Sequence, residues 1–430
     1  MRMCIHSRPF RFIALLVLLA SAPTSAQSLD EVSVRLLDRA QPRVVSIAGH
    51  GAPVRLFAGG FTNEIARIVP GDTATLSRSN DQVYLNLGES GIFATSIRIE
   101  PAAGGQIAVA VGNGGSPSDV RRYEGRIFIS PDETDGLLRL INEVSIDDYV
   151  AAVVAAEYGF DDLEGAKAMA VIIRTYTMAV MNKYGSEYDH VDHTLSQVYR
   201  GTEGITPTIR EAVRQTQGEV LSYKGELIEA VYFAASGGHT ADNDAVWLAE
   251  AAPYLRGKPD PYGGSAPQST WTFRVSRDRL LGALSATYGA VTGFVIDKRG
   301  KDDRVTSIEL LKASGRHKTI GGNEFRMLIL EHFGDATLRS TLFTAGRDGD
   351  EYVFEGRGSG HGVGLSQWGA HELAQRNSSY REILEFYYTD VHLQRLDDLT
   401  NAEPLPAAAS STDPPDAPVS SAPKSGRIGW

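Results

Sequence analysis

The first part of the chain alternates between hydrophobic and polar positions in short runs. Between residues 28 and 142 these runs are separated by Gly, Pro, Asn and Asp, which favour turns. Successive side chains of a strand point to opposite faces, so the alternation predicts β-structure. Strands are expected at residues 43–47, 82–87, 97–99, 107–111 and 125–129. We expect this region to pack on the part of the chain that follows it.

The pattern changes to helical spacing between residues 147 and 185. Ala and Val recur at helix-compatible intervals, which predicts a helix that ends at Glu157. Asp161 or Asp162 is expected to N-cap a second helix, and Gly185 to terminate it. Glu157 therefore lies at a helix end beside hydrophobic side chains. Poor solvation there raises the pKa of a carboxyl group, as a general acid requires, although a capping or salt-bridging Glu fits the same position.

The remainder of the chain mixes strands and helices. A β-rich region, a helical pair and further strands together predict the α+β class. The helix over 324–332 is expected to be an ordinary packing element. The other expected elements are a helix over 207–217, a hairpin of strands 220–223 and 228–233, a strand and helix over 272–288, strands over 295–312, and helices over 368–375 and 380–388.

Both ends of the chain differ in composition from the middle. Three arginines, an apolar run and a small-residue end at Ala26 predict an export signal peptide. The run is shorter than a membrane span, and no later stretch reaches that length. Pro, Ala, Ser and Asp dominate the last residues, which are predicted to be disordered. The expected organisation is a signal peptide (1–26), a β-rich region (27–140), a catalytic domain (141–396) and a disordered tail (402–430).

Charge and cysteine content restrict the partners. The net charge of −11 becomes −14 without the signal peptide, because that segment holds three arginines and no acidic residue. Such a charge repels nucleic acids and anionic membranes, so neither is expected as a partner. Cys4, the only cysteine, lies in the expected signal peptide. The mature chain therefore has neither disulfides nor thiolate metal ligands.

Two histidines form a candidate metal site. His190 and His193 are three residues apart with aspartates beside them, a spacing that suits two zinc ligands. A third ligand would have to come from a distant residue such as His239 or His361. A structural or hydrogen-bonding role explains the pair without metal, and the lack of cysteine favours that role. We expect no cofactor, with zinc as the open alternative.

Two glycine-rich segments carry polar side chains. In the segment 236–240, adjacent glycines allow backbone N–H groups to approach a ligand, and side chains add donors. A serine-hydrolase interpretation of Ser236 fails because no nucleophile elbow surrounds it. The segment 356–369 contains six glycines and leads into a helix, whose N-terminal N–H groups are available to a bound ligand.

Four segments resemble, in order, the motifs of SpoIID/LytB-domain proteins, which act on peptidoglycan. The likeness covers residues 141–396. It departs at Tyr158-Gly159, where the family commonly has Met-Pro, and at Met169, where Gln is usual. Some relatives are thought to bind zinc near the histidine pair with Cys and His. The matching segments are Glu157 with Glu164, Lys167, Ala170 and Arg174-Thr175-Tyr176, then SQVYRG (196–201), YFAASGGHT (232–240) and GHGVGLSQWGA (360–370).

The resemblance implies a peptidoglycan lytic transglycosylase. Such an enzyme cleaves the linkage between N-acetylmuramic acid (MurNAc) and N-acetylglucosamine (GlcNAc) and leaves 1,6-anhydro-MurNAc ends, here in strands without stem peptides. Glu157 is the expected acid and base. The amidase-enhancer branch implies an alternative, a non-catalytic module that presents peptidoglycan to an N-acetylmuramoyl-L-alanine amidase. A zinc hydrolase using His190 and His193 is the third hypothesis, and the lack of a His-Glu-x-x-His motif weakens it.

The matched motifs also supply the expected substrate-binding residues. Gln197 offers an amide suited to a sugar acetamido group. Arg174 lies in an apolar helical stretch, so we expect it to be buried and paired with Glu157 or Asp148. Peptidoglycan strands and a cell-wall amidase are the expected partners of an exported, periplasmic or wall-associated protein. The full set is Arg174, Gln197, Tyr199, Ser236, Gly237, Gly238, His239, Thr240, His361, Ser366, Gln367 and Trp368.

Overall fold

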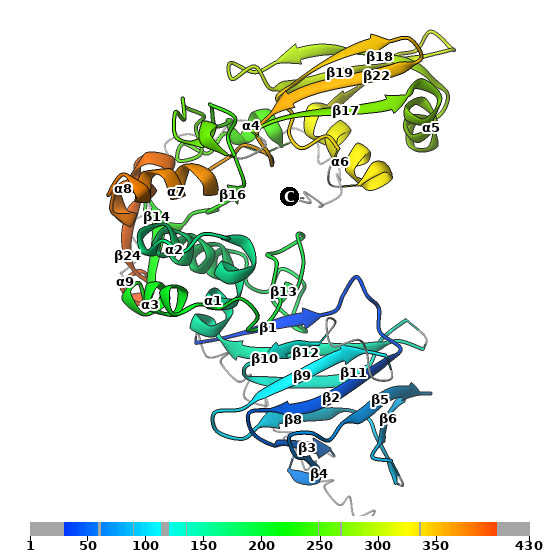
Figure 1. The fold of residues 1–430 in the computed structure, drawn as a ribbon, viewed down its shortest axis with the longest axis vertical. Coiled ribbons are helices and arrows are strands. Elements are labelled where there is room, and N and C mark those ends of the chain that lie inside the picture. Colours follow the sequence, from blue (N-terminus) through cyan, green and yellow to red (C-terminus); the bar gives the residue numbers. More distant parts are fainter. Residues whose placement is uncertain are drawn as a thin grey trace, which may run out of the picture.

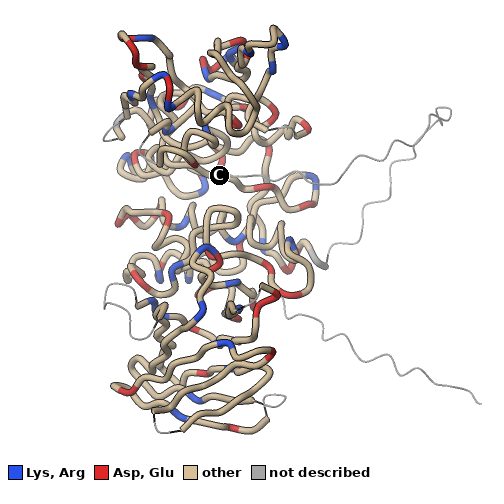
Figure 2. The backbone as a smooth tube through the Cα atoms, turned by 90° about the vertical axis from the view of Figure 1, so that its right-hand side faces the viewer, with Lys and Arg blue, Asp and Glu red and all other residues tan. Residues whose placement is uncertain are grey.

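The computed structural model describes residues 30–58, 62–88, 90–112, 120–134, 136–247, 249–266, 269–334 and 337–401. The predicted signal peptide and the predicted tail lie outside these residues. The described chain forms three parts along its long axis: a β-rich part, a helical part and a second β-rich part that carries two helices (Figure 1). Acidic and basic residues are interspersed over all three (Figure 2). The predicted α+β class is confirmed.

The first part contains two sheets that share one hydrophobic core (Figure 1). Within the described residues, their strand orders are β13-β1-β12-β11-β8-β3-β4 and β10-β9-β2-β5-β6-β7. The five expected strands appear as β2, β6, β8, β9 and β11. The strands are β1 (Glu31–Leu36), β2 (Val44–His50), β3 (Val54–Ala58), β4 (Asn63–Ile68), β5 (Ala74–Ser79), β6 (Gln82–Asn86), β7 (Gly91–Ala94), β8 (Ile97–Pro101), β9 (Gln106–Val111), β10 (Arg121–Tyr123), β11 (Arg126–Pro131), β12 (Leu138–Ser145) and β13 (His190–Val191).

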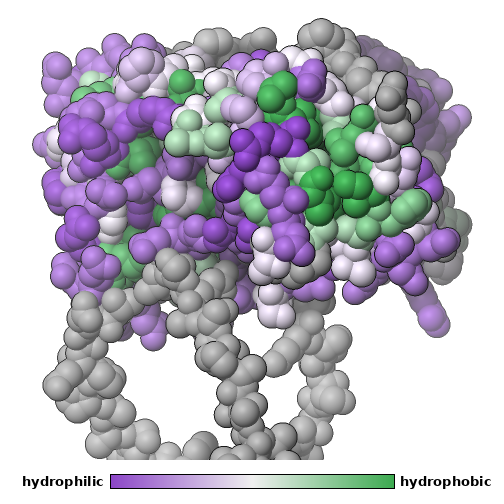
Figure 3. Space-filling model, turned by 90° about the horizontal axis from the view of Figure 1, so that it is seen from below, coloured by the Kyte–Doolittle hydropathy of each residue, from purple (hydrophilic) through white to green (hydrophobic). Residues whose placement is uncertain are grey.

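The outer end of this first part is seen in Figure 3, where hydrophobic side chains gather among polar ones. Its inner end is joined to the helical part. β1 pairs in parallel with β13, which follows the central helices in sequence, and both parts contribute to the same core. The expectation that the β-rich region packs on the following part is therefore confirmed.

The helical part is organised around α2 (Leu163–Ala179), which packs against the helices on either side of it and is buried along most of its length. Asp162 caps it by accepting the N–H of Gly165 at 2.8 Å. The predicted end at Gly185 was wrong, because the chain turns at Asn182 (φ 58°) and Asp189 accepts its N–H. The other helices are α1 (Ile146–Glu157), α3 (Pro207–Gln215), α4 (Asn243–Val246), α7 (Gln367–Gln375), α8 (Tyr380–Tyr387) and α9 (Leu396–Asn401).

Short strands complete the helical part. The expected hairpin is only partly present, since β14 (Glu219–Tyr223) pairs with β15 (Glu226–Leu227) and with β24 (His392–Arg395). Of the predicted second strand over 228–233, residues 228–231 are not a strand, and only residues 232–233 are, as β16. β16 (Tyr232–Phe233) pairs in parallel with β23 (Leu365–Ser366). This pairing places two of the matched motifs side by side.

The third part has a hydrophobic core of its own, centred on aromatic residues such as Phe325 and Phe354. Two sheets with the orders β17-β22-β21 and β18-β19-β20 enclose this core together with α5 and α6. Among the described residues, no helix is long and apolar enough to cross a membrane. The elements are β17 (Thr270–Ser276), α5 (Arg277–Tyr288), β18 (Val291–Arg299), β19 (Val305–Lys312), β20 (Lys318–Gly321), α6 (Gly322–Phe333), β21 (Phe343–Asp348) and β22 (Glu351–Arg357), preceded by a short 3₁₀ turn at Gly263–Ser265.

Candidate active site

A cleft of about 730 Å³ is lined by residues of all three parts. Glu157 lines it from the C-terminal end of α1, and Tyr232 lines it from β16. The opposite wall belongs to α6 and the segment after it. The remaining lining residues are Arg39, Thr194, Phe233, Ala234, Arg326, Met327, Leu330, Glu331, Arg339, Ser359, Gly360, His361 and Gln367.

The surroundings of Glu157 favour a protonated carboxyl. Burial raises its pKa above the ordinary value for glutamate. The N–H of Val198 donates to its Oε1 at 3.0 Å, and this bond, a side-chain hydrogen bond with Tyr232 and the charge of Arg200 lower the pKa in part. The C-terminal end of a helix also disfavours negative charge. The cleft therefore contains a carboxyl group that keeps its proton to higher pH than an exposed glutamate does.

Gln197 is connected to this site through its hydrogen bond with Tyr232. It is 1% exposed and does not line the cleft. Thr177 Oγ1 donates to Gln197 Oε1 at 3.0 Å, and Gln197 Nε2 donates to the hydroxyl of Tyr232 at 3.4 Å. Gln197 thus orients Tyr232, which in turn bonds Glu157. The predicted contact of the Gln197 amide with a sugar acetamido group stays a prediction.

The loop after Glu157 is firmly held, although its sequence departs from the family pattern. The hydroxyl of Tyr158 donates to Asp162 Oδ2 at 3.0 Å, and His371 Nδ1 lies 2.7 Å from the same oxygen. Phe160 stacks on His371 with ring centroids 4.2 Å apart and meets the edge of Trp368. The bonds of Asp162 to Tyr158 and His371 therefore connect this loop to the start of α2 and to α7.

His361 lines the cleft as a neutral imidazole. Its Nε2 lies 2.9 Å from the carbonyl oxygen of Tyr232, and its Nδ1 accepts the N–H of Val363 at 3.1 Å. Burial lowers its pKa to about 3, with the charge of Arg326 as a second cause. The Nε2 of His361 thus connects the segment 356–369 to β16, and its Nδ1 stabilises that segment itself.

The cleft gathers some predicted residues and leaves others outside. Glu157, His361 and Gln367 line it. Ser366 accepts the N–H of Gly369 as the N-cap of α7, and Tyr199 donates to Asn142. The predicted residues that the described structure places outside the lining are Arg174, Gln197, Tyr199, Ser236, Gly237, Gly238, His239, Thr240, Ser366 and Trp368.

Arg174 is buried, as expected, with 2% of its surface exposed. Its predicted pairing with Glu157 or Asp148 was wrong. Its Nη2 lies 3.0 Å from Asp147 Oδ1, and its Nη1 donates to the carbonyl oxygen of Thr216 at 2.8 Å. Asp148 instead accepts the hydroxyl of Ser145. Arg174 therefore connects α2 to the start of α1, at the end remote from Glu157.

The two glycine-rich segments contact each other. A Cβ on Gly237 would lie 3.0 Å from the backbone nitrogen of Gly358, and one on Gly364 would lie 2.0 Å from the carbonyl oxygen of Val231. Gly238 donates its N–H to Ser236 Oγ at 3.2 Å. The close approach that the glycines predict is thus made to the protein's own backbone.

The histidine pair does not form a metal site. His190 is buried and stacks on Tyr149, and burial lowers its pKa to about 4. His193 Nε2 lies 2.9 Å from Asp38 Oδ2. The proposed third ligand His361 has both ring nitrogens in hydrogen bonds, and no group of three His, Cys, Asp or Glu side chains in the described ranges is arranged to hold a metal. These residues do not fit the zinc ligation suggested for some relatives.

Three arginines of the cleft have no counterpart in the sequence-based site. Arg326 belongs to α6, Arg339 to the segment after it, and Arg39 to the turn after β1. The expected packing helix over 324–332 is present as α6, which packs in the core of the third part and also forms a wall of the cleft. No local signal marks these arginines, since only the tertiary fold brings them opposite Glu157.

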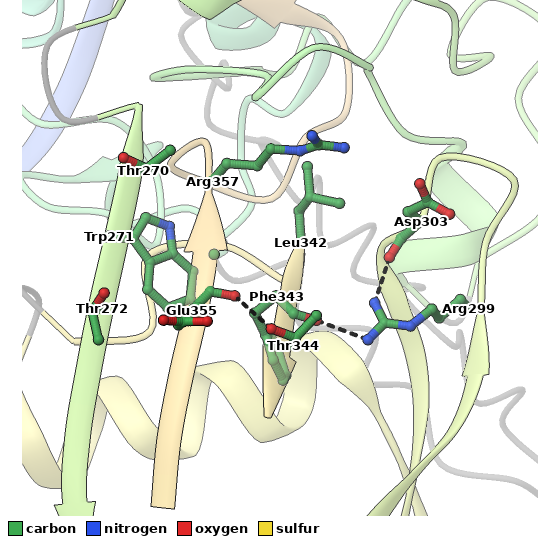
Figure 4. A pocket seen from close by; sticks show the side chains of 11 residues that line it. Thr270, Trp271, Thr272, Arg299, Asp303, Leu342, Phe343, Thr344, Glu355 and Arg357 are labelled. Atoms are coloured by element: carbon green, nitrogen blue, oxygen red, sulfur yellow. Dashed lines mark hydrogen bonds between the residues drawn. The ribbon is translucent and has the colours of Figure 1, made fainter. Parts of the chain in front are cut away.

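A second cavity of about 770 Å³ lies on the sheet β17-β22-β21 and contains none of the predicted residues (Figure 4). Thr270, Thr272, Thr344 and Glu355 line it, and Arg299 closes one side by donating to the carbonyl oxygen of Phe343 at 2.9 Å. The carboxyl groups that line this cavity, those of Asp303 and Glu355, are exposed, whereas that of Glu157 is partly buried.

Comparison with known proteins places this site in a family. A family model described as Stage II sporulation protein, SpoIID, matches residues 134–223. Stage II sporulation protein D of Bacillus subtilis is 30% identical over 286 residues, which cover 61% of this chain and 78% of that protein. The chain belongs to the SpoIID family. The match to the family model includes Glu157 and all of α1 and α2.

Two further relatives extend the likeness of this SpoIID-family chain. An uncharacterised protein of Brachyspira hyodysenteriae is 30% identical over 370 residues, covering 84% of this chain and 92% of that protein. The amidase enhancer of Bacillus subtilis is 31% identical over 276 residues, covering 53% of this chain and 37% of that protein. The likeness to the Brachyspira protein thus extends well beyond the part that the family model matches.

Proposed function

We propose that this protein is a lytic transglycosylase that cleaves the MurNAc–GlcNAc linkage of peptidoglycan and leaves 1,6-anhydro-MurNAc ends. The observation that carries the proposal is the placement of Glu157 in the cleft with a raised pKa. A general acid must hold a proton at the pH at which it works. Membership in the SpoIID family and the similarity to an amidase enhancer support a cell-wall-related function.

The reaction needs one carboxyl group in two roles. Glu157 gives its proton to the glycosidic oxygen, and the bond between that oxygen and C1 of MurNAc breaks. The 2-acetamido group of the sugar stabilises the charge that develops at C1. The ionised Glu157 then takes the proton of the C6 hydroxyl while O6 bonds to C1, so no water is consumed and the acid is restored.

The neighbours of Glu157 suit this sequence of steps. Burial favours the protonated form that begins the reaction. The N–H of Val198 and the hydrogen bond with Tyr232 stabilise the carboxylate that exists between the two proton transfers. Gln197 keeps Tyr232 in place for that task. The proposal includes no cofactor.

A second candidate is a non-catalytic module that presents glycan to an N-acetylmuramoyl-L-alanine amidase. The similarity to the amidase enhancer of Bacillus subtilis favours it. In either case we propose that the protein acts outside the cytoplasm. The basic residues, apolar run and small-residue end of residues 1–26 support export.

Digestion of purified glycan strands without stem peptides, followed by mass analysis of the products, tests the proposal. Anhydro ends, which are lighter than reducing ends by one water, are the expected products. Reducing ends would contradict the proposal and indicate hydrolysis, for which Glu331 on the opposite wall is available as a second carboxylate. Absence of products together with glycan binding would favour the presenting module.

A further inference from the structure

The second cavity lies in the third part of the chain and is as large as the cleft. Its volume of about 770 Å³ falls within the range of roughly 300–1,000 Å³ that is usual for ligand sites. Residues of β17, β22 and the start of β21 line one side of it, and the end of β18 with the turn after it lines the other (Figure 4). The third part thus has room for a ligand outside the cleft.

Three charged side chains of this cavity have no opposite charge beside them. Arg299 donates to two neutral acceptors, the carbonyl oxygens of Asp303 at 2.7 Å and Phe343 at 2.9 Å. Arg299, Asp303 and Arg357 are all exposed, and within the described part of the chain none of the three forms an ion pair. Two guanidinium groups and a carboxylate are therefore available to a ligand.

The rest of the lining is polar as well. The hydroxyls of Thr270, Thr272 and Thr344 lie on strands of the sheet, and Glu355 stands between the last two in the strand register. A neutral sugar would use the hydroxyls but not the separated charges. A ligand with carboxylates and an ammonium group would use both, because guanidinium groups bind carboxylates and carboxylates bind ammonium groups through charge-assisted hydrogen bonds.

Two chain segments connect this cavity to the cleft. Arg339 and Gly360 line the cleft, whereas Leu342 and Arg357 line the cavity. The N–H of Gly360 donates to the carbonyl oxygen of Arg339 at 2.9 Å, and that of Arg357 donates to the carbonyl oxygen of Leu342 at 3.0 Å. Three residues of chain span at most roughly 10 Å. The two sites are therefore adjacent.

The stem peptide of peptidoglycan has the chemistry that the cavity requires. It carries free carboxylates and, where it is not cross-linked, a free amine on its diamino acid. A stem of three or four residues reaches roughly 10–14 Å when extended. A peptide that is attached to the wall close to a strand in the cleft is thus long enough to enter the cavity.

We propose that the second cavity binds a stem peptide of peptidoglycan, with Arg299 and Arg357 on its carboxylates and Asp303 on its ammonium group. This inference rests on the proposed action on peptidoglycan, because that action brings this peptide to the protein. The cleft and the cavity then bind different components of the wall. The cleft holds the glycan strand that is cut, and the cavity holds the protein on a peptide that remains nearby.

Calorimetric titration of the wild-type protein with a soluble stem tripeptide, acetylated at its N-terminus, tests the proposal. Two analogues remove one kind of charge each: in one the amine of the diamino acid is acetylated, and in the other the carboxyls are amidated. Each removed charge should weaken binding by roughly two- to fivefold, as for an exposed ion pair, and binding should fall with salt. Absence of binding, or equal binding of all three peptides, would overturn the inference.

Arg357→Gln and Asp303→Asn assign the two charges. Asn adopts the positive φ of 64° at position 303 readily, so the turn should be retained. Arg357→Gln should weaken binding of the parent peptide but not of the amidated one, and Asp303→Asn should weaken binding of the parent but not of the acetylated one. Arg274→Gln is the matched control, since Arg274 is exposed on the same sheet but is paired with Asp348 and Glu351 outside the cavity.

Unchanged peptide binding in both test variants, with melting curves like that of the wild type, would contradict the assignment. An equal loss in Arg274→Gln would also contradict it, because the effect would then not come from the cavity. Peptide-free glycan is the competing ligand. If Arg357→Gln weakens binding of that glycan as much as binding of the peptide, the cavity is a glycan site and the inference fails.

The same titrations keep this inference separate from the proposed activity. If the wild-type protein cuts no glycan, the proposed activity fails, but peptide binding still decides the inference. If the protein releases anhydro ends and binds no stem peptide, the inference fails and the activity stands. Glu157→Gln, which alters the cleft, should bind the peptide as the wild type does. Loss of peptide binding in this variant would place the peptide in the cleft and overturn the inference.

Discussion

The two cavities of this protein have nearly the same volume, about 730 and 770 Å³, but they place a carboxyl group in opposite surroundings. In the cleft, Glu157 lies at a helix end, partly buried and hydrogen-bonded, with a raised pKa. In the cavity of Figure 4, Glu355 is exposed on a strand of a sheet. Cavity size therefore does not distinguish the sites. The solvation of the carboxyl does, because burial of Glu157 raises its pKa.

The largest expected difference between the two cavities appears when the carboxyl of each is removed in turn. Glu157→Gln retains the size and hydrogen-bonding capacity of the side chain but not its proton, so glycan cleavage should fall by roughly 10²- to 10⁴-fold or more. Glu355→Gln should leave the rate unchanged. The measurement is the rate at which anhydro ends appear in peptide-free glycan.

Glu157→Asp sharpens the same test, because withdrawing the carboxyl by one methylene should also impair cleavage severely. Normal rates in Glu157→Gln, with normal folding, would place the acid elsewhere. Equal loss in Glu157→Gln and Glu355→Gln would remove the distinction between the two cavities.

The next largest effect concerns stability. Arg174→Ala breaks the ion pair between a buried guanidinium and Asp147, together with its bond to the carbonyl oxygen of Thr216, so it should lower the free energy of unfolding by about 3 kcal/mol. Arg376, whose ion pair with Glu372 is exposed, provides the control, and Arg376→Ala should cost about 0.5 kcal/mol. Urea denaturation measures both. Similar losses in the two variants would mean that Arg174 is as well solvated as Arg376.

A smaller effect should appear in the dependence of stability on pH. Because the pKa of Glu157 is raised in the folded state, its contribution to stability is present below the unfolded pKa and is lost as pH rises through the folded pKa. Gln has no proton to lose. The Tm of Glu157→Gln relative to the wild type should therefore increase with pH across this interval. A difference that is constant with pH would argue against a raised pKa.

The smallest effect is expected at the cap of α2. Asp162→Asn weakens a helix cap and its bonds to Tyr158 and His371, and should cost about 1 kcal/mol. Asp161→Asn should change little, since Asp162 is the capping residue in the structure. Thermal melts of the two variants check this. A larger loss in Asp161→Asn would contradict the observed cap.

Much of the local structure follows from the sequence. The alternating runs before residue 140 and the apolar spacing of α1 predict their elements because one face of each is buried in a common core. The end of α2 was missed because the turn that follows it is held by Asp189, which itself accepts a hydrogen bond from Ser33, 156 residues away in sequence. Similarly, β16 leaves its predicted hairpin to pair with β23, a partner more than a hundred residues away. Local pattern does not contain such information.

The site was predicted less completely than the fold. Glu157 was recognised from its position at a helix end and from the family motif. The polar residues of the segment 236–240 were chosen because glycines permit close approach, but the approach is to neighbouring backbone. Arg326 was missed because its helix, α6, was interpreted as a packing element, and α6 does pack, through Phe325, in a separate core. A residue that lines a cleft formed by three parts of a chain is recognisable only when those parts are assembled.

The most direct test of the central claim is the titration of Glu157 itself. Carbon NMR of protein labelled at the glutamate carboxyl groups, compared with the same spectra of Glu157→Gln, identifies the Glu157 resonance as the one that the variant lacks. We predict that this resonance titrates above the ordinary pKa of glutamate, because burial disfavours the carboxylate. A Glu157 carboxyl that titrates at or below the ordinary value would contradict the account.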